Sequence, residues 1–369
     1  MSDKREIVTL QIGGVNWQGW KSVEVSRQVD AIAGSFSLGL TDKWAPGQQA
    51  LPLAAGMACK ILAKGDPLID GHLDKVVFGF KVGEHSITVS GRDKSADLVD
   101  CSAVHHPGHF RGQTAKQLAD VLAGPYGVKV QAETDPGPAL EDFKLEVGET
   151  SFQALDRVLR QRGLLPVPDG RGGVKLIKLG RDRSATALVQ GRNVLEASAT
   201  YDVSDRHSKY VAKGQKKGTD DDYGTSVSEI EGEGEDPGVT RYRPLLVRPE
   251  SQVSRADAKS RAEWEASVRA ARSVTVQVTV QGWRQDGGAL WDVGLMVACD
   301  LPYLRLQRDL LLAKVSLSQS REKGTLAKLD LKDPKAFDKK PPQGKGKKGD
   351  LQSVAAQSAD EGYQEIRGQ

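Results

Sequence analysis

The 369-residue chain has few cysteines, few aromatic residues and no long hydrophobic run. Its three cysteines, Cys59, Cys101 and Cys299, are odd in number and far apart, which argues against a disulfide framework and predicts reduced, buried thiols. No apolar run approaches the roughly 18 residues of a membrane span. The start MSDKREIVTL also lacks the apolar segment of a secretory signal. These absences predict a globular protein made in the cytoplasm.

A strong charge of either sign is also missing. Lysine and arginine number 52 against 49 aspartate and glutamate residues, so the formal net charge is only +3. Dedicated nucleic-acid binders usually carry a clustered basic face. The near balance therefore argues against that class of protein.

A convincing metal site is absent as well. His105, His106 and His109 lie in the segment HHPGH, and the first and last have the i,i+4 spacing of a zinc-binding helix. Pro107 and Gly108 would break that helix, and no glutamate follows His105. The segment predicts a turn with solvent-facing imidazoles.

Other candidate sites are equally incomplete. Asp220–Asp222 lacks the alternating ligands of a calcium loop, and GRGG at 170–173 lacks the Lys-Ser/Thr of a phosphate loop. The lysines of 339–349 form a short basic tail, and Cys101 near His105 has no third, orienting group. The sequence therefore predicts no catalytic residue, no cofactor and no metal ligand, although 49 acidic residues leave a carboxylate pair open.

Short β-strands dominate what is present. Within residues 1–91, IVTLQI, FSLGL, ACKILA, DKVVFGF and HSITVS are separated by turn residues, which predicts an antiparallel barrel or sandwich. Trp17 and Trp20 are expected to pack near its first turn.

Residues 92–190 change in character and predict an α+β insertion. SADLVD and TAKQLADVLAGPYG read as helical, and the second places Leu118, Val121 and Leu122 on one face. Residues 147–163 predict a clearer helix, with Thr150 or Ser151 as its cap. A strand, a glycine-rich turn and a second strand follow in LLPVPDGRGGVKLIKLG.

Residues 191–332 predict a second β-domain with two additions. The acidic, glycine-rich segment 216–239 is expected to be a mobile loop, because it has almost no large apolar side chains. A helix is expected at 252–272, followed by strands at 273–283, 293–300 and 310–318. Residues 333–369 form a basic tail that we expect to be flexible.

A repeated phrase suggests that the two β-domains are related. Residues 87–92 read ITVSGR and residues 278–284 read VTVQGWR, each an alternating strand that runs into a glycine and an arginine. If the likeness is real, Thr88–Arg92 should superpose on Thr279–Arg284. If it arose by chance, these strands should occupy unrelated places in their sheets.

Several longer segments, in order, resemble a known family. They are IGGVNWQGWKSVEVSRQVDAIAGSFSLGLTDKW, SITVSGRDKSADLVDCSA, GETSFQALDRVLRQRGLL, NVLEASATYDVSDRHSKYVAKGQ, RAEWEASVRAARS with VTVQGWRQDGGALW, and LLLAKVSLSQSREKGTLAKLDLKDPKAF. Over roughly residues 6–338 the chain resembles the baseplate hub proteins of contractile-tailed phages, specifically the Mu-like tail protein P group. More distantly it resembles the T4 baseplate hub and the N-terminal part of type VI secretion spike proteins.

The resemblance implies a mainly β, α+β fold like that of phage tail hubs, with two related antiparallel β-barrel domains. It implies a homotrimeric ring that joins the sixfold tail tube to the threefold spike, with no enzymatic activity. Its partners would be other copies of itself, the tail spike protein, the tail tube and other baseplate proteins, with DNA at most passing through the lumen. The chain would belong to the virion baseplate and to the host cytoplasm during assembly.

Two other functions stay open from the residues alone. A tail-associated peptidoglycan hydrolase would need acidic residues that converge in a pocket. A carbohydrate-binding adhesin would need exposed aromatic side chains, whereas Trp17, Trp20, Trp283 and Trp291 are expected to pack in cores.

Overall fold

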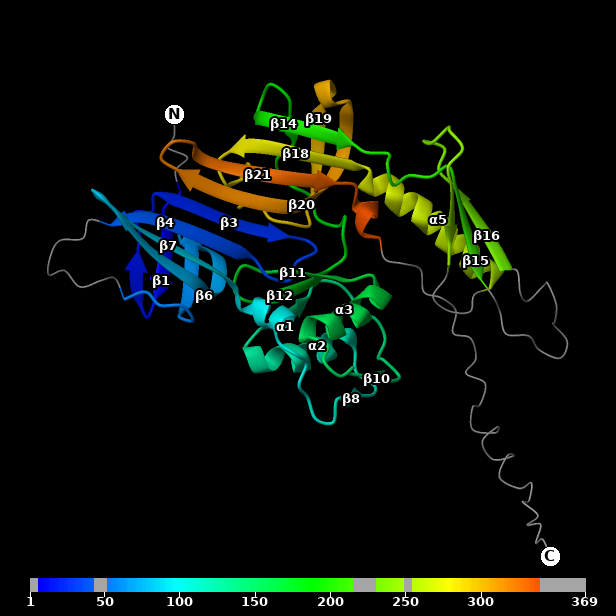
Figure 1. The fold of residues 1–369 in the computed structure, drawn as a ribbon, viewed down its shortest axis with the longest axis horizontal. Coiled ribbons are helices and arrows are strands. Elements are labelled where there is room, and N and C mark those ends of the chain that lie inside the picture. The colour runs from blue at the N-terminus through cyan, green and yellow to red at the C-terminus, as the bar shows by residue number, and fades with distance from the viewer. Residues whose placement is uncertain (1–5, 43–51, 215–229, 249–253, 339–369) are drawn as a thin grey trace, which may run out of the picture. The chain divides into compact units, whose positions relative to one another are not determined.

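The computed structural model describes residues 6–42, 52–214, 230–248 and 254–338. These residues form two compact units (Figure 1). Unit 1 comes from Met1–Asp205 and Val268–Lys339, and the described residues of unit 2 lie within Arg206–Ser267. Within the described part of the chain, no helix has both the length and the apolar character needed to cross a membrane.

The first half of unit 1 consists of seven strands with alternating burial. Val23 and Val25 of one strand, and Ile87 and Val89 of another, face the core, while the residues between them face outward. The strands are β1 (Val8–Ile12), β2 (Val15–Trp17), β3 (Ser22–Gln28), β4 (Ser35–Asp42), β5 (Ala58–Ala63), β6 (Asp66–Lys81) and β7 (Glu84–Asp93).

An α+β segment with its own hydrophobic core follows. Thr114 and Thr150 each begin a helix with a capping box, in which the threonine and a glutamine three residues later exchange hydrogen bonds. The GRGG segment is the turn between two antiparallel strands, as the sequence predicts. The elements are η1 (Lys94–Ala96), α1 (Asp97–Asp100), β8 (His109–Phe110), α2 (Ala115–Ala123), η2 (Gly124–Tyr126), β9 (Val130–Ala132), β10 (Phe143–Lys144), α3 (Ser151–Arg162), β11 (Leu165–Pro168) and β12 (Val174–Ile177).

The second half of unit 1 is again built from strands. Val276, Val278 and Val280 alternate toward the same core that the first half lines. The elements are β13 (Leu188–Val189), β14 (Val194–Tyr201), β18 (Val274–Gln281), β19 (Met296–Leu301), η3 (Pro302–Leu304), β20 (Leu306–Ser320), β21 (Gly324–Lys332) and η4 (Pro334–Phe337).

Unit 2 contains a three-stranded sheet and the first part of a long helix. The elements are β15 (Lys209–Gly214), β16 (Ile230–Glu235), β17 (Pro244–Val247) and α5 (Arg255–Arg272). The helix agrees with the one expected at 252–272.

The prediction of a mobile loop over 216–239 is wrong for residues 230–235, which form β16; residues 216–229 lie outside the described residues. Two ion pairs explain the difference, because Glu233 lies 2.8 Å from Lys209 and Glu231 pairs with Lys213 on the neighbouring strand. Glu231 and Glu233 are therefore paired with lysines across the ladder and do not simply repel each other. The basic tail lies outside the described residues from position 339 onward.

Unit 1 is mainly β, and its two halves share one continuous sheet. The sheet has 13 strands, and its main path runs β14-β18-β21-β20-β3-β4-β7-β6-β5-β1-β2. No ladder among the described strands closes either half on itself, so the two expected barrels stay a prediction.

The halves nevertheless repeat one strand order. Five strands that are consecutive in the first half lie in the order β3-β4-β7-β6-β5, and the second half has β14-β18-β21-β20-β19. In both halves, the strands numbered by their order in the chain lie side by side in the sheet as first, second, fifth, fourth, third. A sixth strand that precedes each set lies beside its last member, antiparallel for β1 on β5 and parallel for β13 on β19. The fold is internally duplicated.

The repeated phrase, ITVSGR at 87–92 and VTVQGWR at 278–284, does not mark this duplication. β7 takes the place of β21 and not of β18, so the expectation that Thr88–Arg92 superposes on Thr279–Arg284 is wrong. The two glycines also differ: a Cβ on Gly91 would lie 1.9 Å from the carbonyl oxygen of His72, whereas Gly282 follows its strand with φ +86°. Alternating β-branched residues are common to many strands, which explains the chance likeness.

A β-bulge marks the true correspondence. Residues 73–76 read LDKV and residues 312–315 read LAKV, and the ladders β6–β7 and β20–β21 each shift register within these segments. Asp93 ends β7, Asp333 directly follows the equivalent strand β21, and both precede 3-10 turns. Aligning the bulges places residue 92 on residue 332 and residue 35 on residue 275.

Unit 2 gives the first testable prediction. A Cβ on Gly232 would lie 2.1 Å from the backbone nitrogen of Lys259 in α5. The variant Gly232→Ala should therefore push the helix off the sheet and destabilise unit 2 by about 2 kcal/mol, measured by hydrogen exchange of β15 and β16 amides. Gly124→Ala is the control, because nothing lies within 4 Å of its added Cβ and its φ is not positive; equal loss in both variants would contradict the prediction.

Candidate assembly surface

The two halves of unit 1 join edge to edge through β3 and β20. The strands are antiparallel, with Ser22 opposite Ser320 and Gln28 opposite Lys314. Leu317 and Val25 lie opposite each other and are both buried. This junction makes one sheet out of two similar halves, so it shows what kind of contact such a half can make.

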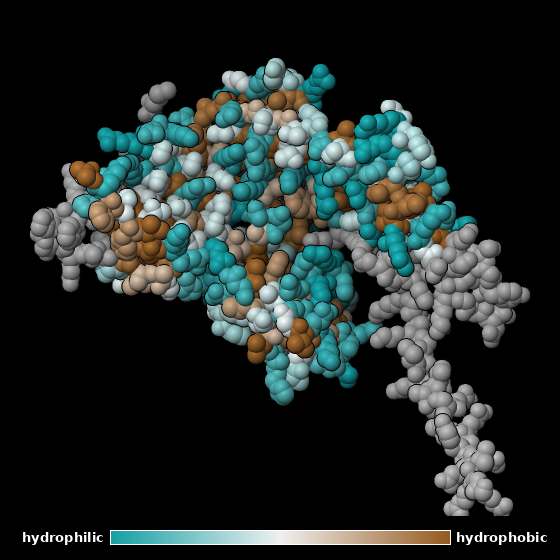
Figure 2. Space-filling view, in the orientation of Figure 1, coloured by the Kyte–Doolittle hydropathy of each residue, from teal (hydrophilic) through white to brown (hydrophobic). Residues whose placement is uncertain are grey.

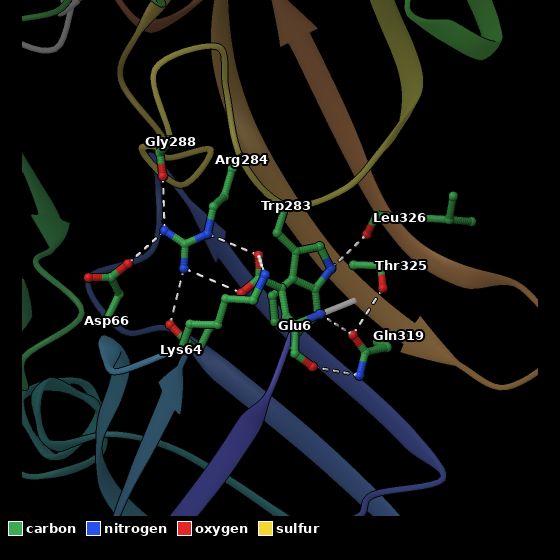
Figure 3. Close-up of polar contacts among 10 residues, drawn as sticks. Glu6, Lys64, Asp66, Trp283, Arg284, Gly288, Gln319, Thr325 and Leu326 are labelled. Carbon is green, nitrogen blue, oxygen red and sulfur yellow. Dashed lines mark hydrogen bonds and ion pairs between the residues drawn. The ribbon is translucent and has the colours of Figure 1, made fainter. Parts of the chain in front are cut away.

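A buried ion pair closes one end of the junction (Figure 3). The Nε of Arg284, which follows β18, donates to Glu6 Oε1 at 2.9 Å, and Glu6 precedes β1. The Nη1 of Arg284 also donates to Asp66 Oδ2 at 2.6 Å and to the carbonyl of Gly288 at 2.9 Å. The Glu6 side chain is only 3% exposed. Arg284 therefore ties the start of the first half to the second half.

Neutral hydrogen bonds complete the same cluster (Figure 3). The backbone nitrogen of Glu6 donates to Gln319 Oε1 at 2.9 Å, and Gln319 Nε2 donates back to the Glu6 carbonyl at 3.0 Å. Thr325 Oγ1 donates to the same Gln319 oxygen. The fully buried Trp283 donates its Nε1 proton to the carbonyls of Ser318 and Leu326. Every one of these groups is satisfied, so the cluster rigidifies the junction.

A second polar centre lies under the other end of β3. Arg27 is buried and donates to the carbonyl of Leu68 at 2.6 Å and to Asp292 Oδ1 at 3.0 Å. Asp93 is also buried, and its two oxygens accept from the backbone nitrogens of Gly34 and Asp70. Burial raises the pKa of Asp93 to about 7, against the lowering effects of Arg27 and the two backbone donors.

A carboxyl with such a pKa in a hollow of about 400 Å³ is a candidate acid for a hydrolase. Asp74 and Arg92 also line that hollow. Both oxygens of Asp93 accept backbone hydrogen bonds, however, and Asp74 Oδ2 accepts from Arg92 Nε at 2.8 Å. The arrangement is therefore that of structural carboxylates.

The segment HHPGH is a turn followed by a short strand, as the sequence predicts. The ring of His105 lies 4.8 Å from that of Phe110, and His106 is exposed. His109 donates to Asp142, which lowers the pKa of that carboxyl. Among the described residues, no three His, Cys, Asp or Glu side chains are placed to hold a metal ion together. Asp220–Asp222 lies outside the described residues.

The prediction of buried thiols holds for two cysteines of three. Cys59 and Cys299 are buried, and burial raises the pKa of each thiol to about 12. Cys101 is exposed, which corrects the prediction: it follows α1 directly, where the chain leaves the core. All three are free.

Two long stretches of strand edge in unit 1 have no partner among the described strands. On β6 the open edge is Lys75–Lys81, because these residues pair with β7 only. The second open edge is Glu196–Asp202, which comprises most of β14 and the residue after it, because β14 pairs with β18 only. Large apolar side chains are exposed along both, namely Val77, Phe78 and Phe80 on β6 and Leu195 and Tyr201 on β14. Figure 2 shows apolar surface at the left of the molecule, in the region of the strands that Figure 1 draws in blue and cyan. Unpaired strand edges are ready-made templates for another chain.

Analysis of the sequence alone named Trp283 as a core residue and Arg284 as part of the repeated phrase, but it assigned neither residue to a junction. Glu6 and Arg284 are separated by 278 positions, and nothing local marks them as partners. The sequence analysis did not predict strand β3, although SVEVSRQ carries a recognisable signal: Val23 and Val25 alternate with polar residues. β21 carries a similar signal in GTLAKLDLK.

The junction predicts that Arg92 and Arg284, the two arginines of the repeated phrase, contribute differently to stability. Arg284→Met would leave Glu6 buried without its hydrogen-bonded cation, so we expect a loss of about 3 kcal/mol in the free energy of unfolding. Arg92→Met is the matched control, because its partners Asp74 and Asp100 are about half exposed, and it should cost about 1 kcal/mol or less. Urea unfolding checks both; equal losses would show that the buried pair is not special.

Asp93 predicts a pH effect. Between pH 4 and 7 the unfolded chain releases the Asp93 proton while the native chain keeps it, so this group lowers the free energy of unfolding as pH rises toward 7. Asp93→Asn cannot ionise, so the stability of the wild type relative to this variant should fall over that range. Urea titrations of both proteins at several pH values measure the difference; a constant difference would mean that Asp93 is ionised throughout.

Comparisons with known proteins agree with this architecture. Residues 7–93 match the family "Mu phage baseplate assembly protein GpP-like, N-terminal", residues 95–178 match "Baseplate hub protein gp44-like, second domain", and residues 254–340 match "Mu phage baseplate assembly protein GpP, fourth domain". The chain is 32% identical to "Baseplate hub protein gp44" of Escherichia phage Mu, over 89% of this chain and 88% of that protein.

Solved structures are similar over most of the chain. The prophage MuSo2 43 kDa tail protein from Shewanella oneidensis aligns with a TM-score of 0.81 at 31% identity, covering 90% of this chain and 99% of that one. The tail protein from Neisseria meningitidis MC58 aligns with a TM-score of 0.75 at 23% identity, covering 91% and 100%. The E. coli c3393 protein, described as a component of the type VI secretion system, shares the fold with a TM-score of 0.52 at 12% identity, covering 87% and 76%. This chain belongs to the baseplate hub protein family of Mu-like phages.

Proposed function

We propose that this chain is the structural baseplate hub of a contractile phage tail. Three copies form a ring that adapts the sixfold tail tube to the threefold spike. Membership of the Mu-like hub family supports the role, and the carrying observation is the repeated strand order of the two halves. Because each chain supplies two similar halves, a closed ring of three chains presents six of them around one axis.

The partners follow from that role. Each copy contacts other copies of itself, and the ring contacts the spike protein, the tail tube and other baseplate proteins. The chain acts in the virion baseplate after assembly in the host cytoplasm. DNA passes through the lumen without tight contacts, which a net charge of +3 per chain permits.

The two alternative functions have little support in the geometry. Three aspartates line the 400 Å³ hollow, namely Asp74, Asp93 and Asp97. Arg92 holds Asp74, and two backbone donors hold Asp93, so the hollow offers no pair of unengaged carboxylates for peptidoglycan hydrolysis. Trp20, Trp283 and Trp291 are buried and Trp17 packs against the same core, so none of them offers a stacking face to a sugar.

Light scattering of the purified chain tests the proposed ring. The expected mass is three times the 39.8 kDa of one chain, because a ring of two-half chains needs three copies to present six halves. A single-chain mass at every concentration, with no trimer in assembled tails, would contradict the proposal.

A peptidoglycan assay tests the absence of hydrolase activity. We expect no turnover by the purified protein. Turnover that Asp74→Asn or Asp97→Asn abolishes while the oligomer stays intact would replace the hub with the hydrolase.

A further inference from the structure

The sheet of unit 2 ends in a strand with one open edge. Its strand order is β16-β15-β17, so β17 pairs with β15 on one side and has no partner among the described strands on the other. This short strand, Pro244–Val247, is followed by the exposed Arg248. An open strand edge can accept one more strand from another chain, which is a recurrent mode of peptide recognition.

The backbone of β17 faces this open edge at Leu246. The carbonyl of Arg243 accepts from the backbone nitrogen of Ser208 at 2.9 Å, and the Arg243 nitrogen donates to Ser208 Oγ at 2.9 Å, so Arg243 faces β15. The backbone groups of successive strand residues point to alternate sides, so Pro244 and Leu246 face the open edge. Pro244 has no N–H to leave unpaired there. Leu246 offers both an N–H and a C=O to an added strand.

Exposed side chains lie beside this edge. Leu246 is 67% exposed and Tyr242 is 87% exposed. Leu246 lies opposite Val211 in the ladder, so the two form a short apolar row across the outer face of the sheet. An apolar side chain of an added strand would lie next to Leu246 and extend this row. Aromatic side chains such as Tyr242 are enriched in protein interfaces.

The charge around β17 selects the kind of strand that can be added. Residues 237–248 contain three arginines, Arg241, Arg243 and Arg248, and no acidic residue. Arg241 and Arg248 are exposed. At the opposite edge of the sheet, β16 has glutamate at three of its six positions. An acidic strand is therefore attracted to the edge of β17 and repelled by the edge of β16.

We propose that the open edge of β17 binds an extended acidic segment of another protein, which joins the sheet as a fourth strand. Main-chain hydrogen bonds to Leu246 hold the segment, one of its apolar side chains packs beside Leu246, and its carboxylates pair with Arg241 and Arg248. The contact lies within unit 2 and does not depend on the proposed ring. It assigns a binding role to a part of the chain for which the proposed function gives none.

A synthetic strand tests the binding. The probe is the fluorescein-labelled peptide GEVEVEG, and the control peptide GKVKVKG has the same valines with lysine in place of glutamate. The full chain should bind the acidic probe about tenfold more tightly than the basic control in fluorescence anisotropy, because the arginines attract only the first. Equal affinity for the two peptides, or no binding of the acidic probe, would overturn the proposal.

A charge exchange locates the site. Arg241→Glu with Arg248→Glu should weaken binding of the acidic probe about tenfold and strengthen binding of the basic peptide. Arg192→Glu with Arg321→Glu is the matched control, because it changes the net charge equally at two exposed positions of unit 1. Equal losses in the two variants would show nonspecific attraction and overturn the site. A smaller mass of the Arg241/Arg248 variant in light scattering would identify a second copy as the occupant, which would also overturn the proposal.

Hydrogen exchange tests the strand geometry in the unaltered chain. The acidic probe should slow exchange of the Leu246 amide about tenfold and leave the open edges Lys75–Lys81 and Glu196–Asp202 of unit 1 unchanged. Equal protection of the unit 1 edges would show that the probe adds to any open strand. Binding without protection of Leu246, together with equal binding of single-stranded oligothymidylate, would show that the arginines hold a polyanion such as nucleic acid. Either result would overturn the proposal.

A proline variant removes the backbone donor alone. Leu246→Pro should abolish binding of the acidic probe and keep the ladder to β15, because its N–H faces the open edge as that of residue 244 would. Leu246→Ala keeps the N–H and should retain part of the binding. Full binding by a folded Leu246→Pro variant would contradict strand addition. If the proline unfolds unit 2, seen as fast exchange of β15 amides, the exchange pattern of the unaltered chain decides.

Discussion

An antiparallel strand has two edges, and every unpaired edge in water invites another strand. This constraint organises unit 1 of the protein. β20 is long enough to serve two partners on one edge, β19 along its first part and β3 along its second, so the two halves become one sheet. The same arrangement leaves the edges Lys75–Lys81 of β6 and Glu196–Asp202 at β14 without a partner among the described strands.

Strand pairing alone does not fix a junction, because a strand can slip along its partner. The cluster around Glu6 and Arg284 prevents such slippage at one end, since a buried ion pair with satisfied neighbours tolerates little displacement. Arg27 and its partners act at the other end of β3. Side chains to which we assign no catalytic role thus determine the geometry in which the halves meet.

Local features of the fold could be predicted from the sequence, because their physics is local. The helix after Thr150, the hairpin around GRGG and the strand containing Ile87 and Val89 follow from capping, glycine turns and alternation. The place of a strand in a sheet is not local, which is why ITVSGR and VTVQGWR suggested the wrong equivalence. β16 was missed because its glycines look like a loop, whereas close approach to α5 requires them.

The candidate assembly surface was beyond reach for the same reason. Glu6 and Arg284 meet across most of the chain, and the apolar residues of β6 look like an ordinary strand until the missing partner is seen. The family resemblance predicted an assembly, but only the ladder registers show which edges have no partner among the described strands.

The connections between equivalent strands differ greatly in length. Residues 29–34 join β3 to β4, whereas residues 202–273 join β14 to β18 and include unit 2. A ring of three such chains would repeat its strands six times around the axis but its outgrowths only three times. The sheet of such a ring would thus have sixfold repetition, whereas its long connections would have threefold repetition.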